Sequence, residues 1–249
     1  MIFTSIIKYV DDTTVASSSD DPFDSSMQNS VDHLLGWCGD NGMFINVPKT
    51  KEMIIYFGNF FNLDFIPLLN LCSEKVERVN TFKLLGVVFS SDLSWHHHVI
   101  FILEKVSKRL FIVWQLIRCG VSFGDILIVY CSVIRSILEY ACPVWHCGLT
   151  IEQSTDIEKV QKRVLRIIFP DLHYKDALER AGLERLDTRR ERITRETFEA
   201  IKDPGHLLHQ LLPKKDKTRN TRDRYPFILQ KHATIRYCKS FINYCIKKK

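Results

Sequence analysis

The stretch IIKYVDDTTVASSS, residues 6–19, places two adjacent carboxylates between two short apolar runs. The flanking segments, residues 1–10 and 13–19, predict two strands joined by a tight hairpin at Asp11 and Asp12. Adjacent like charges repel each other, and two explanations for the pair remain open. Asp is a common turn former, so the pair can be a solvated turn. Alternatively, its oxygens can hold a hard divalent cation such as Mg²⁺.

The segments after the hairpin predict one helix and then further strands. Met27, Val31, Leu34 and Cys38 fall at helical spacing, and Gly42 ends that helix. Strands are predicted in the runs FINV (44–47), EMIIYF (52–57), LLNLCSEKVERV (68–79) and FKLLGVVFSS (82–91). A strand hairpin, a helix and more strands are typical of an α+β layer.

From Trp95 onward the apolar spacing is helical. Ser94 is predicted to cap a helix whose apolar stripe runs from Val99 to Ile117 and ends at Gly120. Residues 124–140 are apolar almost all round, which predicts a buried helix. Further helices are predicted over residues 151–169 and, as two helices, within 174–201. We therefore divide the chain into an α+β region at 1–93, an all-α region at 94–212 and a tail at 213–249.

Charge is distributed unevenly along the chain. The net charge is +6, but residues 213–249 contain twelve Lys or Arg and two Asp, a local charge of +10. The remainder is therefore slightly acidic. We expect residues 213–224 to be disordered. A basic tail on an acidic body indicates an anionic partner or simply a soluble end.

The predicted helix at 157–168 has one basic face. Its cations fall at positions i, i+3, i+4 and i+7, opposite an apolar side, and they are Lys159, Lys162, Arg163 and Arg166. Such a face either follows a nucleic-acid backbone or is solvated. The same alternatives hold for the arginines at 189, 190, 192 and 195, which nearby glutamates can pair. The tail aromatics, such as Tyr244, can stack on bases or dock on the core.

The eight cysteines contain no CxxC pair, and several lie in apolar helical runs. We expect reduced cysteines in an intracellular protein that is neither secreted nor membrane-bound. Cys142, His146 and Cys147 are the nearest approach to a metal cluster, with weak support from their spacing. The run ILIVYCSVI (126–134) is too short to cross a bilayer.

The segment KYVDDTTV (8–15) resembles the Tyr-x-Asp-Asp box of reverse transcriptases. The similarity continues in family order, and the further segments resemble those of polymerases of non-LTR (LINE-type, jockey-like) retrotransposons. The segments that carry it are LLGWCGDNGMFINVPKTKEMII (34–55), FKLLGVVFSSDLSWHHHV (82–99), SILEYACPVWHCGL (136–149), IEKVQKRVLRII (157–168) and LERLDTRRERI (183–193).

This resemblance implies an RNA-directed DNA polymerase with part of a palm at 1–93 and a helical thumb and C-terminal region at 94–212. Asp11 and Asp12 would be Mg²⁺ ligands and catalytic residues. Lys49 would lie near the incoming triphosphate, although a surface lysine explains it equally well. Tyr9 and the four cations of the basic helix face would contact nucleic acid.

The sequence as written starts a few residues before the Asp pair. We therefore expect that the fingers and the first palm strand, with its metal-binding Asp, are missing. The expected protein is a polymerase fragment that is inactive alone. It would bind RNA or DNA weakly and without sequence preference, and it would self-associate through an uncovered sheet edge.

Two alternatives remain open. The first is a non-enzymatic nucleic-acid-binding or interaction protein derived from such a fragment. The second arises because residues 37–57 also resemble the N-terminal segment named after an AlkB homologue of alkylated-DNA repair, a dioxygenase–methyltransferase family. No His-x-Asp motif for Fe(II) occurs in the sequence, so we do not expect that activity.

Overall fold

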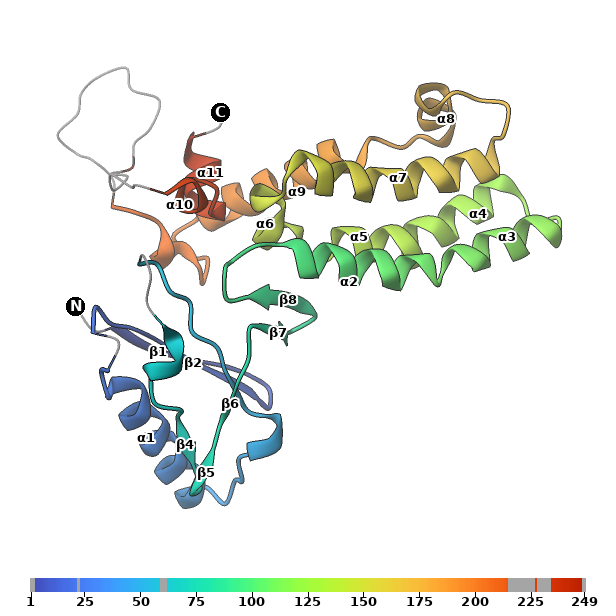
Figure 1. Ribbon diagram of the computed structural model, residues 1–249. Helices are drawn as coiled ribbons and strands as arrows, with labels where there is room; N and C mark the ends of the chain where they lie inside the picture. The colour runs from blue at the N-terminus through green and yellow to red at the C-terminus, as the bar shows by residue number, and fades with distance from the viewer. Residues whose placement is uncertain (1–2, 22, 59–61, 215–226, 228–233, 248–249) are drawn as a thin grey trace, which may run out of the picture. The chain divides into compact units, whose positions relative to one another are not determined.

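A computed structural model describes residues 3–21, 23–58, 62–214, 227 and 234–247 (Figure 1). The described chain combines helices with small sheets, so the predicted α+β class is confirmed. It separates into two compact units. Unit 1 comprises Met1–Leu84 and Phe89–Leu93, and unit 2 comprises Leu85–Val88 and Ser94–Lys249.

Unit 1 begins with the predicted hairpin. Strands β1 (Phe3–Tyr9) and β2 (Asp12–Ser18) pair antiparallel, from Phe3 opposite Ser18 to Tyr9 opposite Asp12. This register leaves Val10 and Asp11 as a two-residue turn. Within the described residues, no third strand pairs with either strand of this hairpin.

Helix α1 (Ser26–Asp40) packs against this hairpin and against the next strands. Gly42, at φ 64°, lies just beyond its C-terminus as predicted, because a residue without Cβ adopts that conformation without strain. The Gln28 side chain donates to the Asn70 carbonyl and accepts from the Asn70 N–H, both at 2.9 Å. The Lys8 ammonium lies 5.3 Å from the Trp37 ring centroid. Even so, α1 buries none of its own residues.

The middle of unit 1 has little regular structure. It holds β3 (Lys51–Glu52) parallel to β6 (Glu77–Arg78), β4 (Asn70–Leu71) paired with β5 (Glu74–Lys75), and the short 3₁₀ helices η1 (Val47–Lys49) and η2 (Leu63–Phe65). Among the described residues of unit 1, only Leu71 and Val76 are buried hydrophobic side chains. Unit 1 therefore has a very small core.

Two of the predicted strands in this region are wrong. Residues 44–47 are irregular and run into η1, where the Asn46 side chain accepts the Lys49 N–H at 3.1 Å. Pro48 also removes a donor that a strand would need. No described strand pairs with residues 53–57, so their backbone groups have no neighbouring strand to hydrogen-bond with.

The predicted strands in FKLLGVVFSS are confirmed as β7 (Thr81–Leu84) and β8 (Val87–Ser90), which form a two-stranded sheet where the chain divides. Two contacts attach residues 85–88 to the helices of unit 2. The Tyr140 hydroxyl donates to the Leu85 carbonyl at 2.9 Å, and the Val88 N–H donates to His98 Nδ1 at 3.3 Å.

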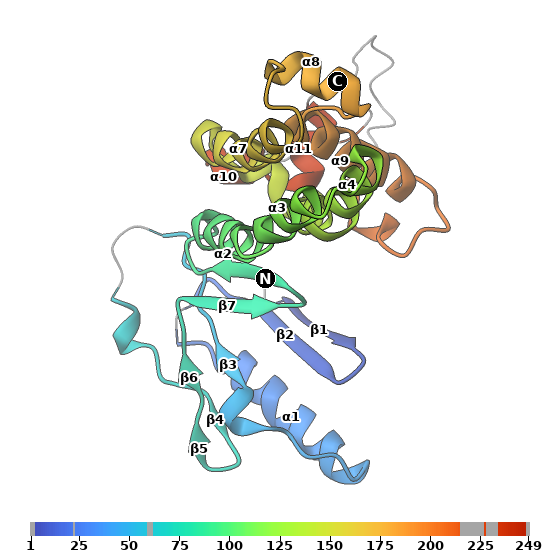
Figure 2. The ribbon, with the colours of Figure 1, turned by 90° about the vertical axis from the view of Figure 1, so that its right-hand side faces the viewer.

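Unit 2 is helical (Figures 1 and 2). Its elements are α2 (His96–Ser107), α3 (Leu110–Arg118), α4 (Phe123–Val129), the π-helix η3 (Tyr130–Arg135), α5 (Ser136–Glu139), α6 (Cys142–Trp145), the 3₁₀ helix η4 (His146–Gly148), α7 (Ile151–Ile168), α8 (Tyr174–Ala181), α9 (Leu186–Ile201), the 3₁₀ helix η5 (His209–Leu211), α10 (Ile235–Cys238) and α11 (Phe241–Lys247). Helix α7 packs against α2, α3, α8 and α9, so it is the centre of this unit.

The first helical stripe differs from its prediction in two details. It is split between α2 and α3, because the Arg109 N–H donates to the carbonyl of Val106, three residues earlier, instead of the carbonyl four residues earlier. The Arg109 side chain donates to the Val133 carbonyl at 2.9 Å. Ser94 is not the N-cap, which is Trp95 without a side-chain cap.

The stretch 124–140, predicted to be a buried helix, is buried on one side only. Ile126, Ile134 and Leu138 are fully buried, but Ile128 is 67% exposed, because only one side of this helix meets the rest of the bundle. The helical stretch Phe123–Gly148 is long and apolar enough to cross a membrane by length and composition alone. Core helices pass the same test, so the expectation of no membrane contact stays a prediction.

The described residues of the basic region after residue 212 include two helices. Its described helices, α10 and α11, belong to unit 2, and α11 packs on α6 and α9. Cys245 and Ile246 form a buried cluster with Phe198, and Phe227 and Phe241 pack against it. Of the predicted disordered segment 213–224, residues 215–224 lie outside the described part of the chain.

Candidate functional site

The aspartate pair lies at the tip of the β1–β2 hairpin. Asp11 is the second residue of the turn, and Asp12 is the first residue of β2, opposite Tyr9. Tyr9, Asp11 and Asp12 are all exposed. Among the described residues, neither carboxylate has a hydrogen-bond or ion-pair partner, so both are open to a ligand from solution.

The residue before the pair has an unusual backbone. Val10 has φ 55°, in the left-handed region. This conformation costs an L-residue about 1–2 kcal/mol, and a β-branched side chain is a genuine outlier there. Strain of this kind persists where the surrounding structure requires it, often at functional sites. Here it holds a tight turn that presents two consecutive carboxylates.

Lys49 lies in the same unit as this pair. It ends η1 and is exposed, and no hydrogen bond or ion pair connects it to Asp11 or Asp12 within the described residues. Lys51, two residues further along, forms an ion pair, because its ammonium lies 2.5 Å from Glu77 Oε2. Unit 1 therefore places Tyr9, Asp11 and Asp12 on one hairpin, and Lys49 belongs to the separate element η1.

A metal cluster of three or more His, Cys, Asp or Glu side chains does not occur in the described part of the chain. Cys142 is fully buried, and burial raises the pKa of its thiol to about 12. His146 Nε2 lies 3.2 Å from Glu191 Oε2. The weakly supported metal site at Cys142, His146 and Cys147 is therefore not formed.

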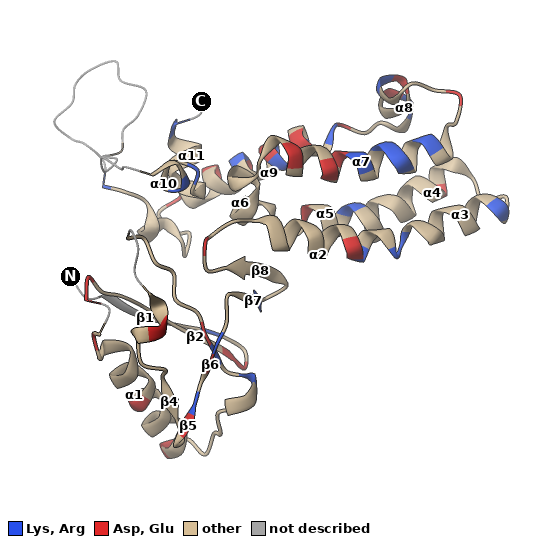
Figure 3. Cartoon of the chain, viewed as in Figure 1, with Lys and Arg blue, Asp and Glu red and all other residues tan. Residues whose placement is uncertain are grey.

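The basic face of α7 is present as predicted. A capping box, in which Thr150 and Gln153 bond to each other's backbone N–H, begins the helix. All four cations are exposed. Figure 3 shows blue Lys and Arg positions along α7. Lys159 bonds to Asp156 at 2.7 Å, and the Lys162 ammonium lies 5.2 Å from the Tyr174 ring centroid. Arg163 and Arg166 have no ion-pair partner among the described residues, so they are the cations most available to an anion.

The arginines of α9 are structural rather than available. Arg189 bonds to Glu139, Arg192 bonds to Glu184 and Glu196, and Arg195 bonds to Glu191, at 2.6–2.8 Å. Of the tail aromatics, Tyr244 donates to Glu191 Oε2 at 2.5 Å. The Arg189–Glu139 pair joins α9 to α5, and the Tyr244–Glu191 bond joins α11 to α9, so Tyr244 docks on the core.

A buried polar network on α7 was not predicted. Glu158 and Gln161 point inward, where Glu158 accepts the Tyr174 hydroxyl and, at 3.0 Å, the Leu186 N–H. Gln161 accepts the Tyr130 hydroxyl at 2.7 Å and donates to Tyr174. The network ties α7 to η3, α8 and α9. The only sequence signal was two polar residues, three apart, within the apolar stripe.

Two buried basic side chains, Arg190 and His98, were also missed. Arg190 is 0% exposed, and its guanidinium lies 5.7 Å from the Trp145 ring centroid and donates to Ser154 Oγ at 3.2 Å. Its Nε and Nη1 have no hydrogen-bond partner among the described residues, and burial lowers its pKa. The ring centroids of His98 and Trp145 are 5.3 Å apart. Burial lowers the pKa of His98 to about 4.

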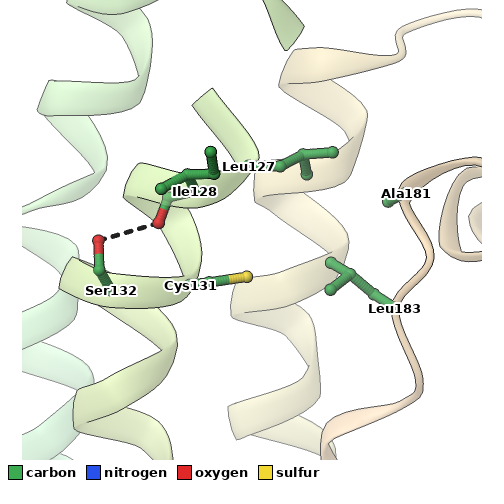
Figure 4. Close-up of a pocket in the computed structure, with 6 residues that line it drawn as sticks. All are labelled: Leu127, Ile128, Cys131, Ser132, Ala181 and Leu183. Carbon is green, nitrogen blue, oxygen red and sulfur yellow. Dashed lines mark hydrogen bonds between the residues drawn. The ribbon is translucent and has the colours of Figure 1, made fainter. Parts of the chain in front are cut away.

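One open hollow of about 420 Å³ lies in unit 2 (Figure 4). Leu127, Ile128, Cys131 and Ser132 line one side, and Ala181 and Leu183 line the other. The Ser132 hydroxyl is used internally, because it donates to the Ile128 carbonyl at 2.9 Å. Burial raises the pKa of Cys131. The lining thus offers apolar contact and no charged catalytic group.

No family model, curated protein or solved structure matches this chain. The assignment of a function therefore rests on its own residues.

Proposed function

We propose that this chain is part of an RNA-directed DNA polymerase of the non-LTR retrotransposon type. In this proposal, unit 1 contributes a portion of the palm and unit 2 contributes the thumb and the following helical region. The observation that carries the proposal is the Tyr9-Val10-Asp11-Asp12 hairpin, with a strained Val10 in its two-residue turn and both carboxylates exposed. The order of the other similar segments along the chain supports it.

The donor set at the hairpin tip suits Mg²⁺. This ion keeps several waters and binds through one or two carboxylates, which Asp11 and Asp12 supply. When bound, it would neutralise charge on a transferring phosphoryl group. The residues of this chain would then hold the ion and position nucleic acid, with Tyr9 next to the pair on β1.

The proposed activity is incomplete in this chain alone. Two-metal phosphoryl transfer uses several carboxylates to clamp both ions. No third acidic group joins Asp11 and Asp12 in the residues that the structure describes. We therefore expect no template-dependent nucleotide incorporation with a primed RNA. Incorporation that disappears in Asp12→Asn would contradict this incompleteness and establish the catalytic role directly.

Paramagnetic Mn²⁺ provides a test that does not depend on turnover. We expect Mn²⁺ to broaden the backbone amide signals of residues 9–13 in the full chain, and Asp11→Asn or Asp12→Asn to abolish this broadening. Asp40→Asn is the matched control, because Asp40 is also exposed and lies at the end of α1 in the same unit. Broadening that persists in the hairpin variants would refute the metal site.

A second candidate function is nucleic-acid binding without catalysis. The observation that favours it is the exposed basic face of α7, where Arg163 and Arg166 are free of ion pairs among the described residues. Binding through such a face would be weak, independent of sequence and strongly dependent on salt, because phosphate contacts release counterions.

Fluorescence anisotropy with a single-stranded RNA tests this second function at several salt concentrations. The double variant Arg163→Glu and Arg166→Glu should flatten the slope of log K against log salt by about 1.4, or about 0.7 per lost phosphate contact. Lys75→Glu, an exposed cation in unit 1, should have a smaller effect. Deleting residues 213–249 is a poor test, because it would uncover Phe198. An unchanged slope in the double variant would show that the α7 face is merely solvated.

A further inference from the structure

Two buried cysteines that are distant in sequence lie against each other in unit 2. Cys147 is in η4, directly after α6, and Cys245 is in α11. The rings of the residues that precede them, His146 and Tyr244, pack edge to face with centroids 6.5 Å apart. The two side chains interact with each other, and both are free thiols. The contact joins the described end of the chain to the middle of the helical bundle.

The surroundings hold this contact in place. Tyr244, next to Cys245, donates to Glu191 of α9, and Phe241 packs edge-on against Phe198 with ring centroids 6.2 Å apart. The residues Cys147 and Cys245 are 6% and 5% exposed, so neither is completely buried. Cys142, on the neighbouring α6, is 0% exposed and provides an internal comparison.

The two thiols differ in acidity. The hydrogen bond from Cys147 lowers the pKa of Cys245, whereas the same bond, together with burial, raises the pKa of Cys147. Cys245 is therefore the better nucleophile of the two, because the thiolate is the reactive form. Cys147 lies in contact with it and can resolve an oxidised partner.

We propose that Cys147 and Cys245 form a redox-sensitive pair that closes to an intramolecular disulfide and locks α11 onto α6 and α9. A small peroxide is the oxidant. The Cys245 thiolate attacks one peroxide oxygen, the O–O bond breaks, and Cys245 becomes a sulfenic acid while hydroxide leaves. The Cys147 sulfur then attacks the Cys245 sulfur and forms the S–S bond. The sulfenic hydroxyl leaves with the Cys147 proton as water. The peroxide gains the two electrons that the thiols lose.

Peptide mapping of the full chain tests this proposal. Trypsin leaves Cys142 and Cys147 on one peptide, residues 136–159, and Cys245 on residues 240–247. The experiment therefore uses Cys142→Ser, in which the first peptide holds only Cys147. After treatment with hydrogen peroxide, alkylation and digestion without reductant, we expect these two peptides to be cross-linked. Adding Cys147→Ser should abolish the cross-link, and Cys119→Ser, at an exposed site, should preserve it.

Thermal unfolding gives a second readout. Closing a loop of about 100 residues should raise the Tm of the oxidised Cys142→Ser protein by on the order of 5–15 °C, and a reductant should reverse the change. The proposal is overturned if both cysteines are recovered alkylated after oxidation, or if Cys245 is cross-linked to an exposed cysteine instead. The Cys142→Ser mapping decides this even if Cys147→Ser fails to fold. Neither readout requires nucleic acid or Mg²⁺, so the result is independent of the proposed function.

Discussion

His98→Gln should remove a defined part of the pH dependence of stability. The His98 ring is buried against Trp145, and Nδ1 accepts the Val88 N–H, which a protonated ring could not do. Its Nε2 has no hydrogen-bond partner among the described residues, so no acceptor among them stabilises a protonated ring at this atom. Burial lowers the pKa of His98 from 6.5 to about 4. Gln is neutral and retains an oxygen that can accept from Val88.

The sign and size follow from proton linkage. Between pH 4 and 6.5 the unfolded state binds more protons at this residue than the folded state, so the free energy of unfolding rises with pH in that interval. Each pH unit is worth at most about 1.4 kcal/mol, and the full interval about 3.4 kcal/mol. Allowing for partial solvent screening, we expect wild type to lose about 2 kcal/mol between pH 7 and pH 4 relative to His98→Gln.

Urea unfolding of both proteins at half-unit pH steps measures this difference directly. Comparing wild type with the variant cancels the titration of acidic groups elsewhere in the chain. His96→Gln is the matched control, because His96 lies on the same helix but is exposed. If the stability difference between wild type and His98→Gln is constant from pH 4 to pH 7, the burial argument for His98 is refuted.

Three further predictions concern backbone strain and buried polar groups, and urea unfolding checks each of them. Val10→Gly should raise the free energy of unfolding of unit 1 by about 0.5–1 kcal/mol, because Gly accepts φ 55° without strain; a loss of stability would count against strain at this turn. Tyr174→Phe should lower the free energy of unfolding of unit 2 by about 1.5–3 kcal/mol, because the buried Glu158 carboxylate loses a hydrogen-bond donor. Arg190→Met should be neutral or stabilising, whereas Arg190→Ala should cost about 2–4 kcal/mol through the cavity it leaves; a large loss in the Met variant would reveal an essential buried charge.

Local patterns in the sequence were sufficient for much of the secondary structure. The β1–β2 hairpin, α1 with Gly42 beyond its end, the β7–β8 pair, α7 and the α8–α9 pair all follow from spacing, turn chemistry and caps. These signals act within a few residues, so no tertiary contact is needed to read them. The basic face of α7 and the exposed aspartate pair were predictable for the same reason.

Tertiary structure alone decided which polar groups are buried and which cations are available. Arg189, Arg192 and Arg195 carry the same charge as Arg163 and Arg166, but glutamates from other turns and elements neutralise them. Arg192 and Arg195 pair with Glu196 and Glu191 at i,i+4 spacing, which the sequence allowed, whereas the Arg189–Glu139 pair depends on how α9 meets α5. The strands that did not form at 44–47 and 53–57 also depended on tertiary structure, because a strand forms only beside another strand. The contact between Cys147 and Cys245 likewise exists only because α11 folds back onto α6 and α9.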